Sequence, residues 1–309
     1  MRGRLALALA LAGLMLAAGP PASPQVAVAG GLTYQDLLRR PTPRPSAHIT
    51  YGPARSQFVE LWLPKGPGPF PVAIMLHGGC WRADLPGLEL MNLAAADLAR
   101  RGVAIWNIEY RRVDEPGGGY PGTFRDVATA VDLLRDEAPK YGLRLGRIVA
   151  IGHSAGGHLA LWAAARGRLP QASALKTPSP LKIDAVVTLG GFSDLKAQHA
   201  VIVASCGRGL IEALTGAATA DRPDVYADTS PAALLPIGAR QFLIHGAWDT
   251  ISPPTIDLAY ARDAGRAGDQ VQRRIISQAG HFDLIAPPET AWQTSAALVI
   301  QQLRLTALP

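Results

Sequence analysis

Cysteine is scarce in this chain of 309 residues, which contains only Cys80 and Cys206. No group of cysteine, histidine and carboxylate residues occurs at the spacing of metal ligands, so no metal site is expected. An oxidising compartment would allow the two cysteines to pair. Because the sequence does not show that their side chains meet, two separate buried thiols are the favoured interpretation.

The chain also lacks blocks of one charge and internal repeats. Its 30 Lys and Arg against 24 Asp and Glu give a formal charge of +6, and the basic residues are scattered singly. A nucleic-acid-binding surface usually shows a basic run or patch, often interleaved with aromatic residues. The sequence therefore predicts no nucleic-acid partner.

No apolar run is long enough for a comfortable membrane span, which takes about 20 residues. The N-terminal run, Leu5 to Ala18, has fourteen residues, follows Arg2 and Arg4, and leads to the small residues 27–29. This pattern is typical of a secretory signal peptide. We predict a signal peptide over residues 1–29, cleavage after Ala29, and an exported protein, periplasmic or secreted, with no stable membrane span. An uncleaved anchor is the alternative.

Apolar runs alternate with helical patterns over the rest of the chain, which predicts a single α/β domain at residues 57–309 after an N-terminal extension at 30–56. The regular alternation breaks at about residues 192–236, which we interpret as a small lid insertion. Strands are expected at 57–63, 72–77, 103–110, 147–151, 184–189, 241–246 and 271–277. Helices are expected at about 88–101, 123–138, 157–165 and 289–303.

A candidate nucleophile, Ser154, lies in the pentapeptide Gly152-His153-Ser154-Ala155-Gly156, between an expected strand and an expected helix. A Gly-x-Ser-x-Gly motif in that position forms a sharp turn, and glycine allows strand and helix to approach closely. The turn exposes the serine hydroxyl at the carboxyl edge of the sheet. The helix N-terminus supplies amide groups that favour a developing negative charge.

A loop that could stabilise an oxyanion, His77-Gly78-Gly79-Cys80-Trp81, follows the expected strand at 72–77. Glycines there allow backbone N–H groups to face an oxyanion without obstruction by side chains. We expect Gly78, Gly79 and Ala155 to be the donors. A plain Gly-Gly turn is the alternative, and a cysteine nucleophile at Cys80 is disfavoured because Ser154 has the better surroundings.

A candidate acid and base, Asp249 and His281, follow consecutive expected strands that are separated by one helix. Both loops should therefore lie on the sheet edge that carries Ser154. We expect His281 to accept the serine proton and Asp249 to orient the imidazole. Asp194, after the preceding strand, is the main rival, and Asp249 could instead cap a helix. The other histidines, His153, His158 and His245, are expected to satisfy local hydrogen bonds.

Five segments resemble α/β-hydrolases, specifically the branch of kynurenine formamidase-like proteins and esterases with a His-Gly-Gly-x-Trp loop. The segments are 77–81, 108–111, 152–158, 245–249 and 280–282, within a similarity that covers about 57–303. The resemblance implies an α/β-hydrolase fold, with a mostly parallel central sheet and helices on both faces. It implies the same catalytic and oxyanion residues, and a buttressing role for Trp81. We also expect Trp81 and His153 to contact substrate.

The expected reaction is hydrolysis of a small carboxylic ester, with a short acyl chain or an aryl group, through an acyl-enzyme and without a cofactor. The alternative is an arylformamidase that cleaves an aryl formamide by the same chemistry, although export argues against it. A serine peptidase and a non-catalytic binding protein are less favoured. Fold alone does not determine the substrate.

Overall fold

The computed structural model describes residues 31–304. These residues form a fold built on one eight-stranded sheet. The strand order is β1-β2-β4-β3-β5-β6-β7-β8. The β1–β2 and β2–β4 pairs are antiparallel, and the pairs from β4 to β8 are parallel. The strands are β1 (Ala47–Thr50), β2 (Phe58–Trp62), β3 (Phe70–Leu76), β4 (Ala104–Ile108), β5 (Leu143–His153), β6 (Ala185–Leu189), β7 (Arg240–Gly246) and β8 (Val271–Ile276).

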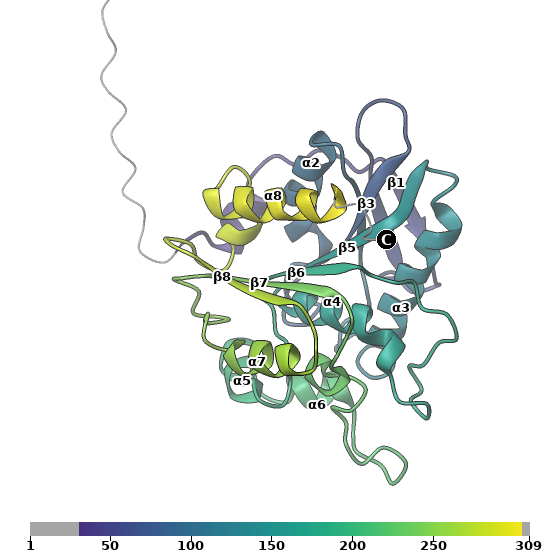
Figure 1. Cartoon of the computed structure of the whole chain (residues 1–309), viewed down its shortest axis with the longest axis vertical. Helices are drawn as coiled ribbons and strands as arrows, with labels where there is room; N and C mark the ends of the chain where they lie inside the picture. The colour runs from purple at the N-terminus through teal and green to yellow at the C-terminus, as the bar shows by residue number, and fades with distance from the viewer. Residues whose placement is uncertain (1–30, 305–309) are drawn as a thin grey trace, which may run out of the picture.

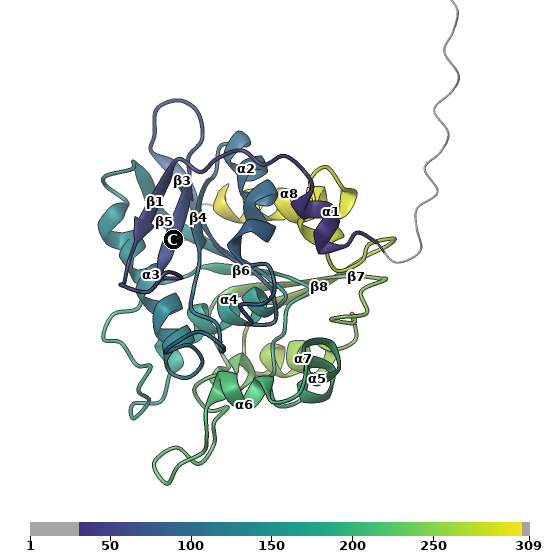
Figure 2. The same cartoon turned by 180° about the vertical axis from the view of Figure 1, so that it is seen from behind.

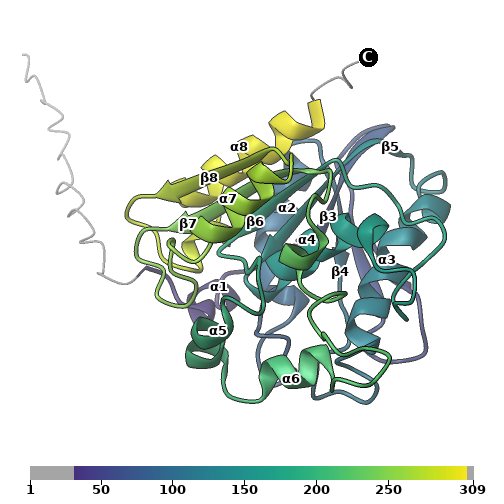
Figure 3. The same cartoon turned by 60° about the horizontal axis from the view of Figure 1, so that its bottom comes forward.

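Helices cover both faces of this sheet, with α1, α2 and α8 on one face and α3, α4 and α7 on the other (Figures 1 and 2). Figure 3 shows α5 and α6 farther from the sheet, beyond α4 and α7. The helices are α1 (Tyr34–Leu38), α2 (Asn92–Arg100), α3 (Gly122–Glu137), α4 (Ala155–Ala165), α5 (His199–Cys206), α6 (Leu210–Thr215), α7 (Leu258–Arg266) and α8 (Thr290–Arg304). Short 3₁₀ turns are η1 (Leu88–Met91), η2 (Arg166–Arg168), η3 (Pro231–Leu234) and η4 (Asp283–Ile285).

The central strands are buried on both faces, and this explains their continuous apolar sequences. In β3, Val72 and Ile74 belong to the core that contains residues of α3 and α4. The intervening Ala73 and Met75 belong to the core that contains residues of α2 and α8. Successive side chains of a strand point to opposite faces, so one strand contributes to both cores. The sheet is therefore a rigid base for the loops at its carboxyl edge.

The predicted mostly parallel sheet is confirmed, and each strand expected from residue 57 onwards is present. Two regions differ in detail from the expectation. The N-terminal extension is part of the fold, because β1 pairs with β2 and α1 contributes the buried Leu37. The insertion at 192–236 contains the two short helices α5 and α6. The predicted signal peptide lies outside the described residues.

Candidate active site

Ser154 lies between the last residue of β5 and the first residue of α4, with a positive φ of 51° and a ψ of −120°, a backbone conformation that is rare for residues other than glycine. The turn requires both flanking glycines. A Cβ at Gly152 would collide with the carbonyl of Gly156, and a Cβ at Gly156 would collide with the carbonyl of Leu76. These contacts produce the sharp strand-to-helix turn expected from the motif.

The structure brings Asp249 and His281 together from the loops after β7 and β8. The Asp249 Oδ2 atom lies 2.7 Å from Nδ1 of His281, and both side chains are buried. Asp249 Oδ1 accepts hydrogen bonds from the N–H groups of Ile251 at 3.0 Å and Ser252 at 2.8 Å. The rival, Asp194, instead accepts from two N–H groups of its own turn. Its carboxylate is therefore committed elsewhere.

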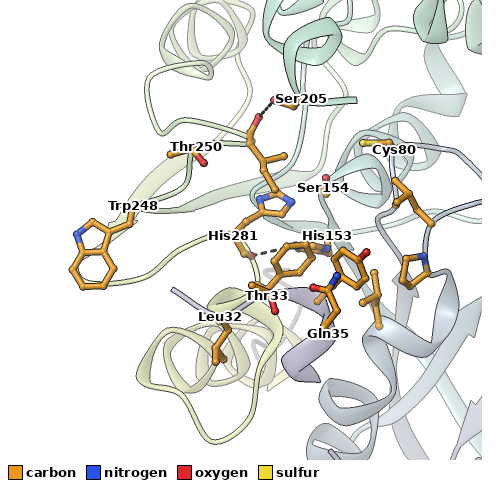
Figure 4. Close-up of a pocket in the computed structure, with 17 residues that line it drawn as sticks. Leu32, Thr33, Gln35, Cys80, His153, Ser154, Ser205, Trp248, Thr250 and His281 are labelled. Atoms are coloured by element: carbon orange, nitrogen blue, oxygen red, sulfur yellow. Dashed lines mark hydrogen bonds between the residues drawn. The ribbon is translucent and has the colours of Figure 1, made fainter. Parts of the chain in front are cut away.

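Ser154 and His281 both line one cavity, and Figure 4 shows the serine hydroxyl beside the imidazole ring. With Nδ1 of His281 donating to Asp249, the remaining ring nitrogen, Nε2, is free to accept a proton. This is the arrangement that a serine nucleophile and its general base require.

Gly190, at the end of β6, packs directly against this carboxylate–histidine pair. Its φ is 59°, and a Cβ there would lie 2.8 Å from His281 Nδ1 and 2.9 Å from Asp249 Oδ2. Sequence reasoning did not single out this glycine, because the contact depends on loops from three different strands. A side chain at position 190 would therefore displace His281, the general base.

Replacing Gly190 with alanine is expected to lower kcat/KM about 100-fold, because a misplacement near 1 Å costs roughly that factor. The matched control is Gly238→Ala, since Gly238 has φ 79° and no atom within 4 Å of an added Cβ. Both variants carry the backbone cost of alanine at positive φ, but only Gly190→Ala contacts the pair. Ester turnover measures the displacement of the Asp249–His281 pair, and melting temperature measures the backbone cost. Equal activity losses would contradict this assignment.

The backbone N–H groups of Gly79, Cys80 and Ala155, near Ser154, make no hydrogen bond within residues 31–304. Gly79 and Cys80 line the cavity, and Ala155 begins α4 next to the serine. The N–H of Gly78 likewise has no partner within these residues, so the predicted donors Gly78, Gly79 and Ala155 all have free N–H groups and Cys80 adds a further one. Gly78 is closely packed, since a Cβ there would lie 2.8 Å from His153 Nδ1 and 3.0 Å from Ser154 Cβ.

His77 determines the orientation of the peptide between Gly78 and Gly79. Its Nδ1 donates to the Gly78 carbonyl at 2.7 Å, and its Nε2 lies 2.9 Å from Glu109 Oε1. In a trans peptide the carbonyl and the following N–H point in opposite directions. The bond therefore turns the N–H of Gly79 away from the imidazole. Burial raises the pKa of Glu109, but His77 and Arg112 outweigh burial and hold this pKa at about 2.

The expectation of two separate thiols is wrong, because Cys80 and Cys206 form a disulfide. Cys206 ends α5, and its Cα lies 5.5 Å from that of Cys80. The insertion folds back over the loop after β3, which brings together residues separated by 126 positions. Cys80 and Trp81 have φ values of 51° and 54°, a region that costs non-glycine residues about 1–2 kcal/mol each. The disulfide helps to hold this part of the loop.

The two residues predicted to contact substrate occupy different positions. His153 lines the cavity, and its Nε2 donates to the His281 carbonyl at 3.2 Å. Burial, followed by the charge of His281, places the pKa of His153 well below its usual value, so its ring is neutral. Trp81 is fully buried, packs against His158 and Phe192, and does not line the cavity. This position fits the predicted buttress of the loop better than a contact with substrate.

The cavity beside Ser154 has a volume of about 410 Å³ and a largely apolar lining. Part of its wall comes from the N-terminal segment 32–35, which sequence reasoning placed outside the hydrolase domain. The Leu32 N–H donates to Asp283 at 3.1 Å, and the Tyr34 ring packs edge-on against Phe282 at 5.9 Å. Both contacts attach this segment to the loop that carries His281. The cavity is lined by residues that include Tyr34, Leu85, Leu90, Trp248, Ile251 and Phe282.

No group of histidine, cysteine and carboxylate residues suited to hold a metal ion occurs in the described range 31–304. Over the same range, no helix combines the length and apolar character needed to cross a membrane.

A sequence model of the BD-FAE family matches residues 59–257, more than half of the chain. The match includes Ser154 and Asp249 and ends before His281. A probable isoprenylcysteine alpha-carbonyl methylesterase of Arabidopsis thaliana is 29% identical over 113 residues, which is 36% of this chain and 23% of the plant protein. This chain therefore matches only a small part of that relative.

Solved structures of esterases have the same fold as this chain. A carbohydrate esterase from gut microbiota is 20% identical, with a TM-score of 0.69 over 85% of this chain and 98% of that one. Esterase B from Lactobacillus rhamnosis is 17% identical, with a TM-score of 0.70 over 87% and 89% of the two chains. At these identities the likeness establishes the fold, and the predicted α/β-hydrolase fold is confirmed.

Proposed function

Because the chain belongs to the BD-FAE family of α/β-hydrolase esterases, we propose that it is a serine hydrolase of carboxylic esters. One observation carries the proposal. The nucleophile Ser154 and the base His281, which the buried Asp249 holds, line one cavity together with Gly79 and Cys80, whose N–H groups are unpaired within residues 31–304. These are the groups that acyl transfer to water requires.

In the first step, the Ser154 hydroxyl attacks the ester carbonyl while Nε2 of His281 takes its proton. Asp249 holds Nδ1 of the ring and stabilises the imidazolium that forms. The N–H groups of Gly79, Cys80 and Ala155 stabilise the oxyanion. His281 then protonates the departing alcohol, which leaves an acyl-enzyme. In the second step, His281 takes a proton from water, the hydroxyl attacks the acyl carbonyl, and Ser154 recovers its proton.

The cavity favours small or aryl esters over long acyl chains. A volume of about 410 Å³ accommodates a short acyl group together with an aromatic ring. Its apolar wall includes the rings of Tyr34, Trp248 and Phe282, against which an aryl group can pack. The solved relatives include a carbohydrate esterase and a further esterase, which fits ester cleavage.

The runner-up is an arylformamidase, which the resemblance of residues 77–81 to the kynurenine formamidase-like branch motivates. We expect kcat/KM for acetyl and butyryl esters of p-nitrophenol to exceed that for N-formylkynurenine by roughly tenfold or more. The departing nitrogen of a formamide must be protonated, whereas a phenoxide leaves readily. Turnover of the three compounds by the purified protein tests the order. A higher kcat/KM for the formamide would establish the runner-up instead.

Export is part of the proposal. The Cys80–Cys206 disulfide supports it, since disulfides persist in oxidising compartments. The arginine-flanked apolar run before residue 30 also supports it. N-terminal sequencing of the protein from the exported fraction is expected to begin at Gly30. An unprocessed protein confined to the cytoplasm would contradict export without affecting the proposed chemistry.

A further inference from the structure

A third buried histidine–carboxylate pair, besides His281 with Asp249 and His77 with Glu109, lies next to the loop that carries Asp249. His245 is in β7, and Asp257 directly precedes α7. Both side chains are about 1% exposed. The His245 Nε2 atom lies 2.5 Å from Asp257 Oδ2, and its Nδ1 atom lies 3.0 Å from the Ser252 carbonyl oxygen. The proposed reaction uses neither residue.

The two nearest partners of the His245 ring, Asp257 and the Ser252 carbonyl, are acceptors, so both ring nitrogens donate; the Ser252 hydroxyl lies farther from Nδ1, at 3.4 Å. A carbonyl oxygen can only accept, and an ionised carboxylate can only accept. Asp257 also accepts hydrogen bonds at Oδ1 from Ser193 at 2.7 Å and from Gln198 at 3.3 Å. His245 is therefore an imidazolium that bridges Asp257 and Ser252.

The pKa of His245 agrees with this protonation state. Burial lowers it, but the hydrogen bond and the charge of Asp257 outweigh burial, and the net shift is upward from the usual value of 6.5. The charged groups that act on the ring are the carboxylates of Asp257, before α7, and Asp249, in the loop after β7. Ser252 and Ser193 are its neutral polar neighbours.

The Ser252 contact connects this pair to the catalytic acid. The Ser252 carbonyl is held by His245, while the Ser252 N–H donates to Asp249 Oδ1 at 2.8 Å. Ile251, which also donates to Asp249, has its carbonyl held by Ser205 at 2.8 Å. The orientation of Asp249 thus depends on a turn whose two carbonyl groups are held by hydrogen bonds, one from His245 and one from Ser205.

We propose that His245, held by Asp257, is a positioning residue for the catalytic acid Asp249. It acts by holding the Ser252 carbonyl, and so fixes the turn whose N–H groups orient the Asp249 carboxylate toward His281. The inference rests on the proposed hydrolase function. It makes the proton on Nδ1 of His245 a requirement for full activity, although this histidine does not line the cavity with Ser154 and His281.

Two substitutions of His245 separate its two hydrogen bonds. In His245→Asn the amide nitrogen takes the place of Nδ1, so the bond to Ser252 is kept and Asp257 loses its donor. In His245→Gln the amide nitrogen takes the place of Nε2, so Asp257 is satisfied and the Ser252 carbonyl is left free. We expect kcat to fall about 10- to 100-fold in His245→Gln and roughly threefold or less in His245→Asn, with KM changed less than about twofold in each.

A purely structural role predicts a different order. Both variants lose the imidazolium charge, but only His245→Asn also leaves the buried Asp257 carboxylate without a donor at Oδ2, so it should have the lower melting temperature. If activity followed stability, His245→Asn would also be the slower enzyme. Tyr260→Phe is the control, because it removes a buried hydrogen bond from α7 to Gln241 at 2.7 Å and leaves Asp249 untouched. It should lose stability and keep wild-type kcat.

The pH profile gives a second readout. Because the folded-state pKa of His245 is raised, its stabilising contribution is complete below about pH 6.5 and is lost as pH rises through the raised value. The proton lost is the one on Nδ1, since Nε2 faces a carboxylate. Wild-type kcat should therefore fall on the alkaline side, and His245→Asn should lack that fall.

The outcomes separate this inference from the proposed function. A wild-type protein that neither hydrolyses p-nitrophenyl acetate nor reacts with a fluorophosphonate at Ser154 would contradict the function itself. An active wild type whose His245→Gln variant keeps kcat, or whose His245→Asn variant is the slower of the two, would contradict only the positioning role.

Discussion

Replacing Ser154 with alanine is expected to lower kcat for ester hydrolysis by a factor of about 10⁴ to 10⁶. No other hydroxyl can substitute, because only Ser154 stands in the turn between β5 and α4, with Ala155 and Gly79 beside it. The remaining rate would come from the oxyanion donors and from substrate binding. Steady-state turnover of p-nitrophenyl acetate by the purified variant measures the loss.

The fold of the Ser154→Ala variant should be intact. Alanine retains the Cβ and meets the same backbone cost at φ 51°, so the melting temperature is expected to stay near that of the wild type. A fluorophosphonate that labels the wild-type serine should not label the variant. If the folded variant kept activity within tenfold of wild type, another residue would have to be the nucleophile.

The second large effect is expected for Asp249→Asn, which should lower kcat by about 10⁴. The asparagine oxygen will face the N–H groups of Ile251 and Ser252, because both need an acceptor. Its NH₂ group must then face Nδ1 of His281. That nitrogen becomes an acceptor, so the proton moves to Nε2, and the ring can no longer take the serine proton.

Asp194→Asn is the matched control for this substitution. The Asp194 carboxylate accepts from N–H groups in its own turn, which an asparagine oxygen can also do, so kcat should remain within about twofold of wild type. Measuring kcat for both variants between pH 6 and pH 9 distinguishes a lost base from a shifted titration. A larger loss in Asp194→Asn would reassign the acid.

The positions of Ser154, Asp249 and His281 could be predicted because they depend on local sequence and on a topological rule. Each of the three follows an apolar strand, and parallel strands bring their carboxyl ends to one edge of the sheet. The donors Gly79 and Ala155 follow from the same reasoning. Periodicity and chain order were sufficient for these residues.

Other features depend on contacts between distant segments, and no local pattern reports them. The orientation of the peptide between Gly78 and Gly79 follows from the hydrogen bond of His77 to a carbonyl. Gly190 matters only because two other loops meet beside it. The helices α5 and α6 are short and are separated by Gly207 and Gly209, so local propensity does not predict regular structure there. The wall at 32–35 depends on Asp283, about 250 residues away.

The disulfide between Cys80 and Cys206 also acts on the unfolded chain. It closes a loop of 126 residues, which contains Ser154 and excludes Asp249 and His281. Restricting the unfolded ensemble over that length is worth about 5 kcal/mol in the chain-entropy model. This is comparable to the whole net stability of a marginal domain, which is about 5–15 kcal/mol. The reduced chain therefore gains more conformational entropy on unfolding than the oxidised chain does. The fraction of the protein that is folded thus depends on the redox state of its surroundings.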